Sequence, residues 1–189
     1  LFGTLNERQT KYVKNIWLSS NQLLLLINDI LDLSKINAGK LNVNPVECFV
    51  NEVLEEAIGI VKSTTYKKSI ELITSVSPDD LEVWADKKLL KQILYNLLSN
   101  AIKFSHENGT VTISAKNVNC PDNGRKYVKF CVSDRGIGID EKDLERVFLE
   151  FEQTDNSYSR EYGGTGLGLP LSKKWVEVQG GKIELHSKV

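Results

Sequence analysis

Two asparagines and a lysine stand at helical spacing in the run ADKKLLKQILYNLLSNAIKFS, as Asn96, Asn100 and Lys103. Asparagine is a mediocre helix former because its side-chain amide competes for the backbone. On a wheel of ~100° per residue the three side chains fall within roughly 60° of one another, on one flank of the apolar face. An Asn carbonyl oxygen suits Mg²⁺, and a nearby lysine can hold a phosphate oxygen. The pattern therefore indicates either a shelf for metal and phosphate or an ordinary solvated flank.

A second pattern, SDRGIGI at Ser133–Ile139, follows a stretch of alternating polar and apolar residues. Asp134 is the first residue beyond that predicted strand, and its carboxylate can accept a hydrogen bond from an exocyclic amine such as that of adenine. Gly136 and Gly138 permit a tight turn and the close approach of a flat ligand. The alternative is a plain glycine-rich turn before a helix N-cap at Asp140.

A third pattern, GGTGLGL at Gly163–Leu169, opens a predicted helix. Amides flanked by glycine at a helix N-terminus bind phosphate well. The stretch is not a Walker A loop, because no G-K-[ST] follows, and it is not a Rossmann fingerprint, because no strand directly precedes it.

The elements that must position these motifs alternate unevenly between helix and strand. The periodicity predicts helices over Thr10–Asn37, Val50–Ser63, the run after an N-cap at Asp86, Asp140–Phe151 and Leu167–Gln179. It predicts strands over Ser69–Val76, Leu81–Trp84, Thr110–Lys116, Tyr127–Ser133 and Lys182–His186. We expect the first two strands to pair and the next two to form a hairpin. The predicted fold class is an α/β sandwich with a mixed sheet.

Composition gives no support for several functions. The chain has 189 residues and a net charge of −1, which gives no electrostatic argument for a nucleic-acid partner. The longest apolar run, LLLLI at Leu23–Ile27, is far too short to span a bilayer. Three widely spaced cysteines predict inert thiols in a reducing compartment, and two scattered histidines make a zinc site improbable.

The helix Thr10–Asn37 carries a wide apolar stripe and ends near Gly39, a C-cap candidate. Such a stripe usually packs against partner helices. Because the chain starts at Leu1 and contains no Met, we expect a piece of a longer protein, with the partner helix in a missing segment or another chain.

The order of the three motifs, with Phe148 and Phe151 between the second and the third, closely resembles the catalytic ATP-binding domain of sensor histidine kinases. Their superfamily includes gyrase B, a heat-shock chaperone and the mismatch-repair ATPase. VFLEFEQTDNSYSREYGGTGLGLPLSKK looks most like the hybrid kinases, and LLLLINDILDLSKINAGK resembles the second helix of the dimerisation and phosphotransfer hairpin. The resemblance implies a Bergerat-type fold with helices on one face of the sheet. It divides the chain into a partial hairpin helix (1–40), a linker (41–49) and a catalytic domain (50–189) that lacks the family's final strand.

The resemblance also implies site residues for ATP and Mg²⁺. Asn100 would hold the metal, Asn96 would support it or share the ion, and Lys103 would touch the phosphates. Asp134 would bind the adenine amine, beside Gly136 and Gly138. The ATP lid would lend its backbone to the phosphates and hinge at its glycines; these residues are Gly164, Thr165, Gly166, Leu167 and Gly168. Arg160 would be either a γ-phosphate contact or a solvated lid charge. Phe148 and Phe151 would anchor the root of the lid, and the stretch Glu152–Tyr162 is expected to be mobile.

Two departures from the family qualify the expected function. The acceptor histidine is absent, since neither His106 nor His186 has its context, and Gln153 stands where many members have arginine. The implied activity is transfer of the ATP γ-phosphate to a histidine outside this sequence, for relay to a response-regulator aspartate. The implied setting is a homodimer whose catalytic region is cytoplasmic, with membrane anchoring of the full-length protein left open. The alternatives are a nucleotide-sensing module without kinase activity and a serine kinase of the anti-sigma type.

Overall fold

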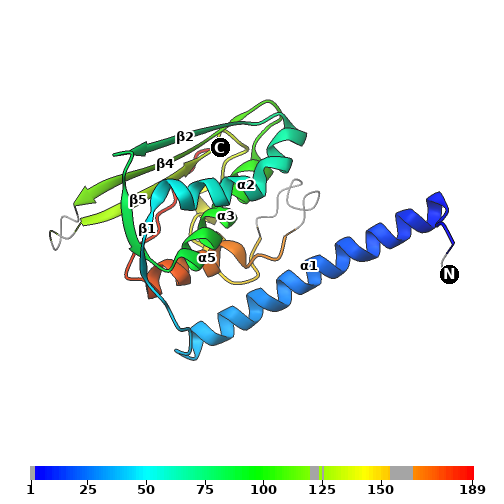
Figure 1. The fold of residues 1–189 in the computed structure, drawn as a ribbon, viewed down its shortest axis with the longest axis horizontal. Helices are drawn as coiled ribbons and strands as arrows, with labels where there is room; N and C mark the ends of the chain where they lie inside the picture. Colours follow the sequence, from blue (N-terminus) through cyan, green and yellow to red (C-terminus); the bar gives the residue numbers. More distant parts are fainter. Residues whose placement is uncertain (1–2, 120–123, 125, 154–163) are drawn as a thin grey trace. The chain divides into compact units, whose positions relative to one another are not determined.

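The computed structural model describes residues 3–119, 124, 126–153 and 164–189. The chain divides into two compact units, Leu1–Leu41 and Asn42–Val189 (Figure 1).

The first unit is a single helix, α1 (Glu7–Asn37), which confirms the helix predicted from Thr10 and begins three residues earlier. Its first turn is closed by a capping box, in which Asn6 Oδ1 accepts from Gln9 N–H at 2.9 Å and Gln9 Oε1 accepts from Asn6 N–H at 3.0 Å. Gly39 follows the cap residue Ala38 with a φ of +64°, as expected beyond a helix end. No helix in the described part of the chain has the length and hydropathy of a bilayer span.

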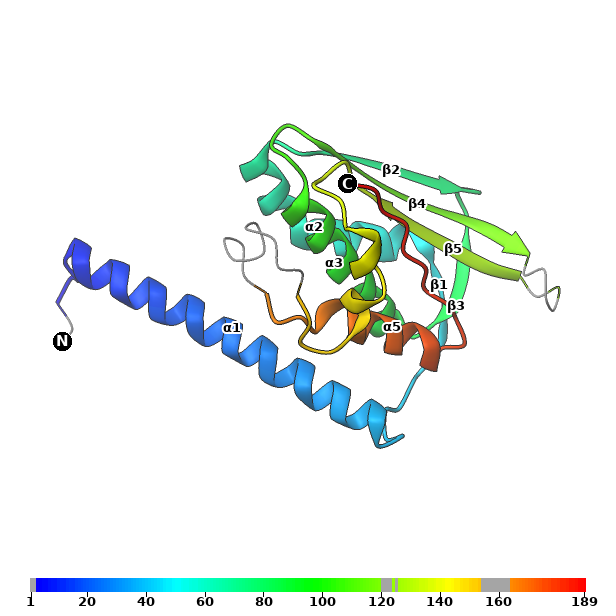
Figure 2. The ribbon, with the colours of Figure 1, turned by 180° about the vertical axis from the view of Figure 1, so that it is seen from behind.

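The second unit places its helices over one face of a mixed sheet (Figures 1 and 2). The three-stranded sheet has the order β2-β4-β5, in which β2 is parallel to β4 and β4 is antiparallel to β5. The smaller sheet is an antiparallel pair of β1 and β3. This arrangement confirms the predicted mixed α/β sandwich. The strands are β1 (Val46–Phe49), β2 (Glu71–Ser77), β3 (Glu82–Ala85), β4 (Thr110–Asn119) and β5 (Lys126–Ser133), and the helices are α2 (Val50–Lys68), α3 (Lys87–Phe104) and α5 (Gly168–Val178).

The core lies between the sheet and the pair α2 and α3. The predicted inner face of α3 is buried throughout; it consists of Leu90, Leu94, Leu98 and Ala101. Facing it are the alternate residues of β4, which are Val111, Ile113 and Ala115. The period-two set of β5, Val128, Phe130 and Val132, packs against this core as predicted. The burial of this face of α3 thus determines which flank of the helix can contact a ligand.

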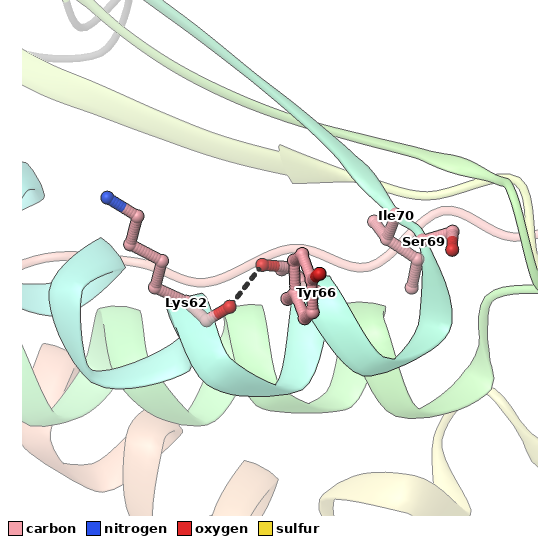
Figure 3. A pocket seen from close by; sticks show the side chains of 5 residues that line it. Lys62, Tyr66, Ser69 and Ile70 are labelled. Atoms are coloured by element: carbon pink, nitrogen blue, oxygen red, sulfur yellow. Dashed lines mark hydrogen bonds between the residues drawn. The ribbon is translucent and has the colours of Figure 1, made fainter.

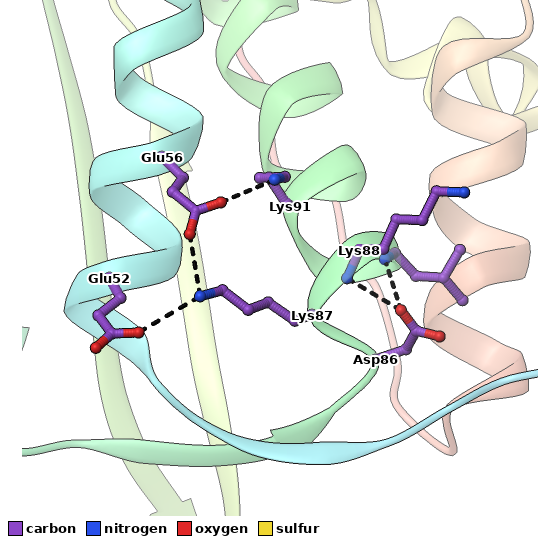
Figure 4. Close-up of polar contacts among 7 residues, drawn as sticks. Glu52, Glu56, Asp86, Lys87, Lys88 and Lys91 are labelled. Atoms are coloured by element: carbon purple, nitrogen blue, oxygen red, sulfur yellow. Dashed lines mark hydrogen bonds and ion pairs between the residues drawn. The ribbon is translucent and has the colours of Figure 1, made fainter.

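Polar contacts align the first turns of α2 and α3 (Figure 4). Glu56 bridges Lys87 at 3.0 Å and Lys91 at 2.8 Å, and its hydrogen bond to Lys91, followed by that to Lys87, lowers the pKa of its carboxyl. Asp86 caps α3 as predicted, because its Oδ1 accepts from the N–H groups of Lys88 at 3.0 Å and Leu89 at 3.1 Å. These contacts set where α3 begins.

Three secondary-structure predictions are wrong. Leu81–Trp84 does not pair with β2; β3 pairs with β1, a strand inside the expected linker 41–49. β3 pairs with β1 instead, because the core-facing residues Cys48 and Val83 meet across the small sheet, while β2 takes β4 as its parallel neighbour.

The predicted helix Asp140–Phe151 consists of two 3₁₀ turns, Glu141–Asp143 and Arg146–Phe148, because the apolar pattern is too short to propagate a helix. Lys182–His186 is not a strand, and it pairs with no strand among the described residues. The chain there is held instead by a side chain, as Ser187 Oγ accepts from the Ile139 N–H at 2.9 Å.

Candidate functional site

The three motifs gather around the C-terminal half of α3. Asn96, Asn100 and Lys103 are all half-buried, on the flank of α3 beside its buried apolar face. The glycine-rich stretch that opens α5 lies beside Asn96 and Lys103, and the SDRGIGI turn lies against the end of the helix, as the contacts below establish. Residues more than 30 positions apart in sequence therefore line one region.

Asn96 connects α3 to the start of α5. Its Nδ2 donates to the Gly168 carbonyl at 3.3 Å and to Ser172 Oγ at 3.3 Å. Ser172 and Leu167 are fully buried, so this junction is part of the packed interior. The carbonyl oxygen of Asn96 takes part in neither bond, and it is the type of ligand that Mg²⁺ prefers.

Lys103 approaches the glycine-rich stretch from the last turn of α3. A Cβ added to Gly164 would lie 3.2 Å from Lys103 Nζ, and the ammonium lies 4.7 Å from the centre of the Phe104 ring. Burial, and then the positive charge of Lys68, lower the pKa of the Lys103 ammonium from its ordinary value. A charge so disfavoured would be stabilised by an anion, which makes Lys103 suited to a phosphate oxygen.

The SDRGIGI turn is docked on the end of α3. Asp134 Oδ1 accepts from the Gly136 N–H at 2.8 Å, which closes the turn, and the Ile137 N–H donates to the Phe104 carbonyl at 3.3 Å. A side chain at Gly136 would clash with that same carbonyl, so the close approach requires glycine. Asp134 itself is exposed, with its carboxylate available to a ligand at this edge.

The two flanks of residues 154–163 are joined to each other. Gln153 Nε2 donates to the Gly164 carbonyl at 2.8 Å, and the Phe151 N–H donates to the Gly166 carbonyl at 3.2 Å. Thr165 Oγ1 accepts from the Leu167 N–H at 3.2 Å and shapes the entry into α5. Arg160 and most of the predicted mobile stretch Glu152–Tyr162 lie outside the described residues.

The two phenylalanines have different environments. Phe148 is half-buried, with Lys173 Nζ 5.5 Å from its ring centre. Phe151 is 59% exposed, so the expectation that it anchors the lid root in the core is wrong for this residue. Its backbone φ of +65° and its N–H bond to Gly166 indicate that the main chain, rather than the ring, makes the connection.

Sequence reasoning missed two residues that support the site. Ser172 receives the Asn96 amide, and its place one turn after Gly168 on the buried face of α5 was the available signal. Lys68, at the end of α2, donates to carbonyl groups of α3, and no local pattern indicated it.

Two other features lie apart from the motifs. An open pocket on the last turns of α2 is lined by Lys62, Thr65, Tyr66, Ser69 and Ile70, and it contains none of the predicted site residues (Figure 3). Within the described ranges, no group of three or more His, Cys, Asp or Glu side chains could hold a metal ion.

Comparison with known proteins gives a consistent result. Residues 85–189 match the family model "Histidine kinase-, DNA gyrase B-, and HSP90-like ATPase". "Hybrid signal transduction histidine kinase B" of Dictyostelium discoideum is 40% identical over 98% of this chain and 9% of its own length. "Circadian input-output histidine kinase CikA" of Synechococcus elongatus is 43% identical over 100% of this chain and 24% of its own. The chain thus spans less than a quarter of these two relatives.

Solved structures have the same fold. Full-length ShkA, in complex with AMPPNP, superposes with a TM-score of 0.77 at 30% identity, covering 94% of this chain and 35% of that one. Histidine kinase ThkA, in complex with response regulator protein TrrA, superposes with a TM-score of 0.68 at 25% identity, covering 95% of this chain and 47% of that one.

Proposed function

Because this chain belongs to the histidine kinase-, DNA gyrase B- and HSP90-like ATPase family, we propose that it is the ATP-binding catalytic region of a two-component sensor histidine kinase. Its activity is transfer of the ATP γ-phosphate to a histidine outside this sequence, from which a response-regulator aspartate receives it. The names of the hybrid kinase relatives, the AMPPNP complex of ShkA and the response-regulator complex of ThkA support this assignment.

One observation carries the proposal: the three motifs converge on the end of α3. Asp134, which could recognise an amine, and Lys103, which could hold a phosphate, are connected to the same last turn, through Phe104 and through the helix itself. A nucleotide has both groups, a base with an exocyclic amine and a chain of phosphates. The site therefore suits an adenine nucleotide better than a ligand with only one of them.

Each residue has a role in this proposal. The Asp134 carboxylate accepts from the adenine amine, while Gly136 and Gly138 let the turn that carries it pack closely against the backbone of Phe104 and Lys188. Lys103 and the backbone of Gly164–Gly168 contact the phosphates. Arg160, outside the described residues, is the candidate for a γ-phosphate contact, with a solvated lid charge as the alternative. The catalytic contribution of these groups is mainly positioning and charge neutralisation, which phosphoryl transfer chiefly requires.

The donor set fits a magnesium ion. The side-chain oxygens of Asn100 and Asn96 are hard neutral ligands, and Mg²⁺ typically takes few protein ligands and completes its shell with phosphate oxygens and water. When bound, the ion would neutralise charge on the phosphates. Asn96 adds a further property, because an amide cannot act as a general base. Hydrolysis of ATP by water should consequently be slow, which preserves the phosphate for the acceptor.

The setting of the full-length protein is also part of the proposal. The unit 1–41 would belong to the dimerisation and phosphotransfer hairpin of a homodimer, and residues 50–189 to the catalytic domain. A cytoplasmic location agrees with Cys48 and Cys131, which are free thiols.

Calorimetric titration with magnesium AMP-PNP tests the nucleotide site. Asp134→Ala should weaken binding by roughly 1–3 kcal/mol, the cost of losing a hydrogen bond to a buried ligand group. Asp134→Asn is the sharper variant, because its carbonyl oxygen still accepts from Gly136 while its NH₂ group faces the adenine amine as a second donor. We expect it to weaken binding as well.

Asp140→Ala, an exposed aspartate six positions later, serves as the control and should bind like wild type. Unchanged affinity in both Asp134 variants would refute the assignment of the adenine pocket.

A further inference from the structure

Lys68 contributes to the site without belonging to any of the three motifs. It is the last residue of α2, and its ammonium reaches across to the end of α3. Nζ donates to the carbonyl oxygens of Lys103 at 2.6 Å, Ile102 at 3.2 Å and Ser105 at 3.3 Å. One side chain therefore serves three carbonyl groups that lie 34 to 37 positions away.

These bonds complete the hydrogen bonding at the end of α3. The last carbonyls of a helix lack partners within it. Here the Ala101 carbonyl accepts from the N–H and Oγ of Ser105, and the Phe104 carbonyl accepts from the Ile137 N–H. The two carbonyls between them accept from Lys68. The positive charge also lies at the end of the helix where its dipole is negative.

The junction so formed is the one from which the nucleotide groups project. Lys103 belongs to the bonded turn, and the Asp134 turn is attached to it through Phe104 and Ile137. We infer that Lys68 is a positioning residue for nucleotide binding, which holds the end of α3 so that the phosphate-binding ammonium and the adenine-binding turn keep their spacing. The inference rests on the proposed function, and it adds a residue outside the motif that begins at Asn96.

Electrostatics give Lys68 a second effect on the same site. Its ammonium is a like charge beside Lys103, and it lowers the pKa of Lys103 after the larger effect of burial. Two like charges near each other repel, and an anion bound beside both of them offsets that repulsion. Phosphates bound there would interact with both charges, so removing Lys68 costs attraction as well as position.

Three variants separate these effects from a general loss of stability. Lys68→Met removes the charge and the donors while keeping a long side chain. Lys68→Arg keeps both charge and donors. Lys67→Met changes the exposed lysine next to it and serves as the matched control. We expect about tenfold weaker binding of magnesium AMP-PNP for Lys68→Met, as for the loss of hydrogen bonds to a charged group. Lys68→Arg should restore most of the affinity, and Lys67→Met should bind like wild type.

Amide hydrogen exchange of Ile137 in the nucleotide-free protein provides the second readout. Its N–H donates to Phe104, so exchange should accelerate about tenfold in Lys68→Met and remain unchanged in Lys67→Met. If Lys68→Met does not fold, Lys68→Gln takes its place, with weaker binding expected because the charge is gone.

The outcomes are distinguishable. Lys68→Met with the nucleotide affinity and the Ile137 exchange rate of wild type would overturn the inference. A loss of affinity in Lys67→Met equal to that in Lys68→Met would also overturn it. If the wild-type chain binds no adenine nucleotide, the proposed function fails, while the exchange of Ile137 still decides whether Lys68 holds the junction.

Discussion

At the scale of single residues, the charge state of the Lys103 ammonium should respond to a bound nucleotide. Burial and Lys68 lower its pKa in the free protein, whereas bound phosphates would favour its protonated form and raise that pKa. The affinity for ATP should therefore be at its full value below the lowered pKa of the free protein, where Lys103 is protonated in both the free and the bound protein. It should fall as the pH rises through the lowered pKa of the free protein, before the ordinary range of lysine is reached.

Titration with ADP and ATP between neutral pH and alkaline pH measures this dependence. Lys103→Met should bind more weakly at neutral pH and should lose the alkaline decrease. An identical pH profile in this variant would contradict the role of Lys103 as the titrating phosphate contact.

The roles of residues could be predicted from the sequence where their contacts are local. The cap at Asp86 and the shared flank of Asn96, Asn100 and Lys103 follow from helical geometry alone. The bonds from Asn96 to Gly168 and Ser172 could not be predicted, because they join residues 72 and 76 positions apart. Lys68 is the extreme case, since a lysine at a helix end looks like an ordinary solvated charge until the acceptor carbonyls are known.

At the scale of elements, the start of α3 depends on Asp86. Its Oδ1 serves two amides of the first turn, and its Oδ2 accepts from the Asn44 N–H at 3.0 Å, which ties the segment before β1 to the helix. Asp86→Ala should lower the free energy of unfolding by roughly 1–2 kcal/mol, the usual cost of losing an N-cap. Urea denaturation followed by circular dichroism measures this.

Glu56→Gln is the comparison, because it weakens exposed ion pairs rather than a cap. Its cost should be clearly smaller than that of Asp86→Ala, because exposed ion pairs contribute little to stability. An equal loss in the two variants would contradict the importance assigned to the cap.

Strand pairing was the least predictable feature of the elements. The hairpin of β4 and β5 was predicted because its strands are adjacent and strongly alternating. The partner of β3 was not, because β1 has only four residues, and its pairing with β3 forms around the whole of α2 and β2. Short 3₁₀ turns such as Glu141–Asp143 likewise have too few residues to show a period.

At the scale of the whole molecule, the proposed function requires a second component. Neither His106 nor His186 has the context of a phosphoacceptor, so the chain alone should not become labelled from radioactive ATP. A separately supplied acceptor hairpin with its histidine should be labelled slowly, because the reaction lacks the effective concentration that a covalent tether provides.

The same assay tests the magnesium assignment. Asn100→Asp keeps an oxygen ligand but adds a negative charge beside the phosphates, so transfer should fall sharply. Asn117→Asp, which adds the same charge at an exposed position of β4, should transfer like wild type. Acid-labile label on the isolated chain would contradict the need for a separate acceptor, and full transfer by Asn100→Asp would exclude Asn100 as the metal ligand.

The contact between Gly138 and the last residues has an evolutionary consequence. Gly138 has a φ of +72°, and a side chain there would clash with the Lys188 carbonyl. The residue after Gly138 is also held by this segment, because the Ile139 N–H donates to Ser187 Oγ. Substitutions near residue 187 and substitutions in the adenine-binding turn therefore cannot accumulate independently. Among descendants of this sequence, the two segments should change together, and a lineage that replaces Gly138 should first have rerouted the chain at Lys188.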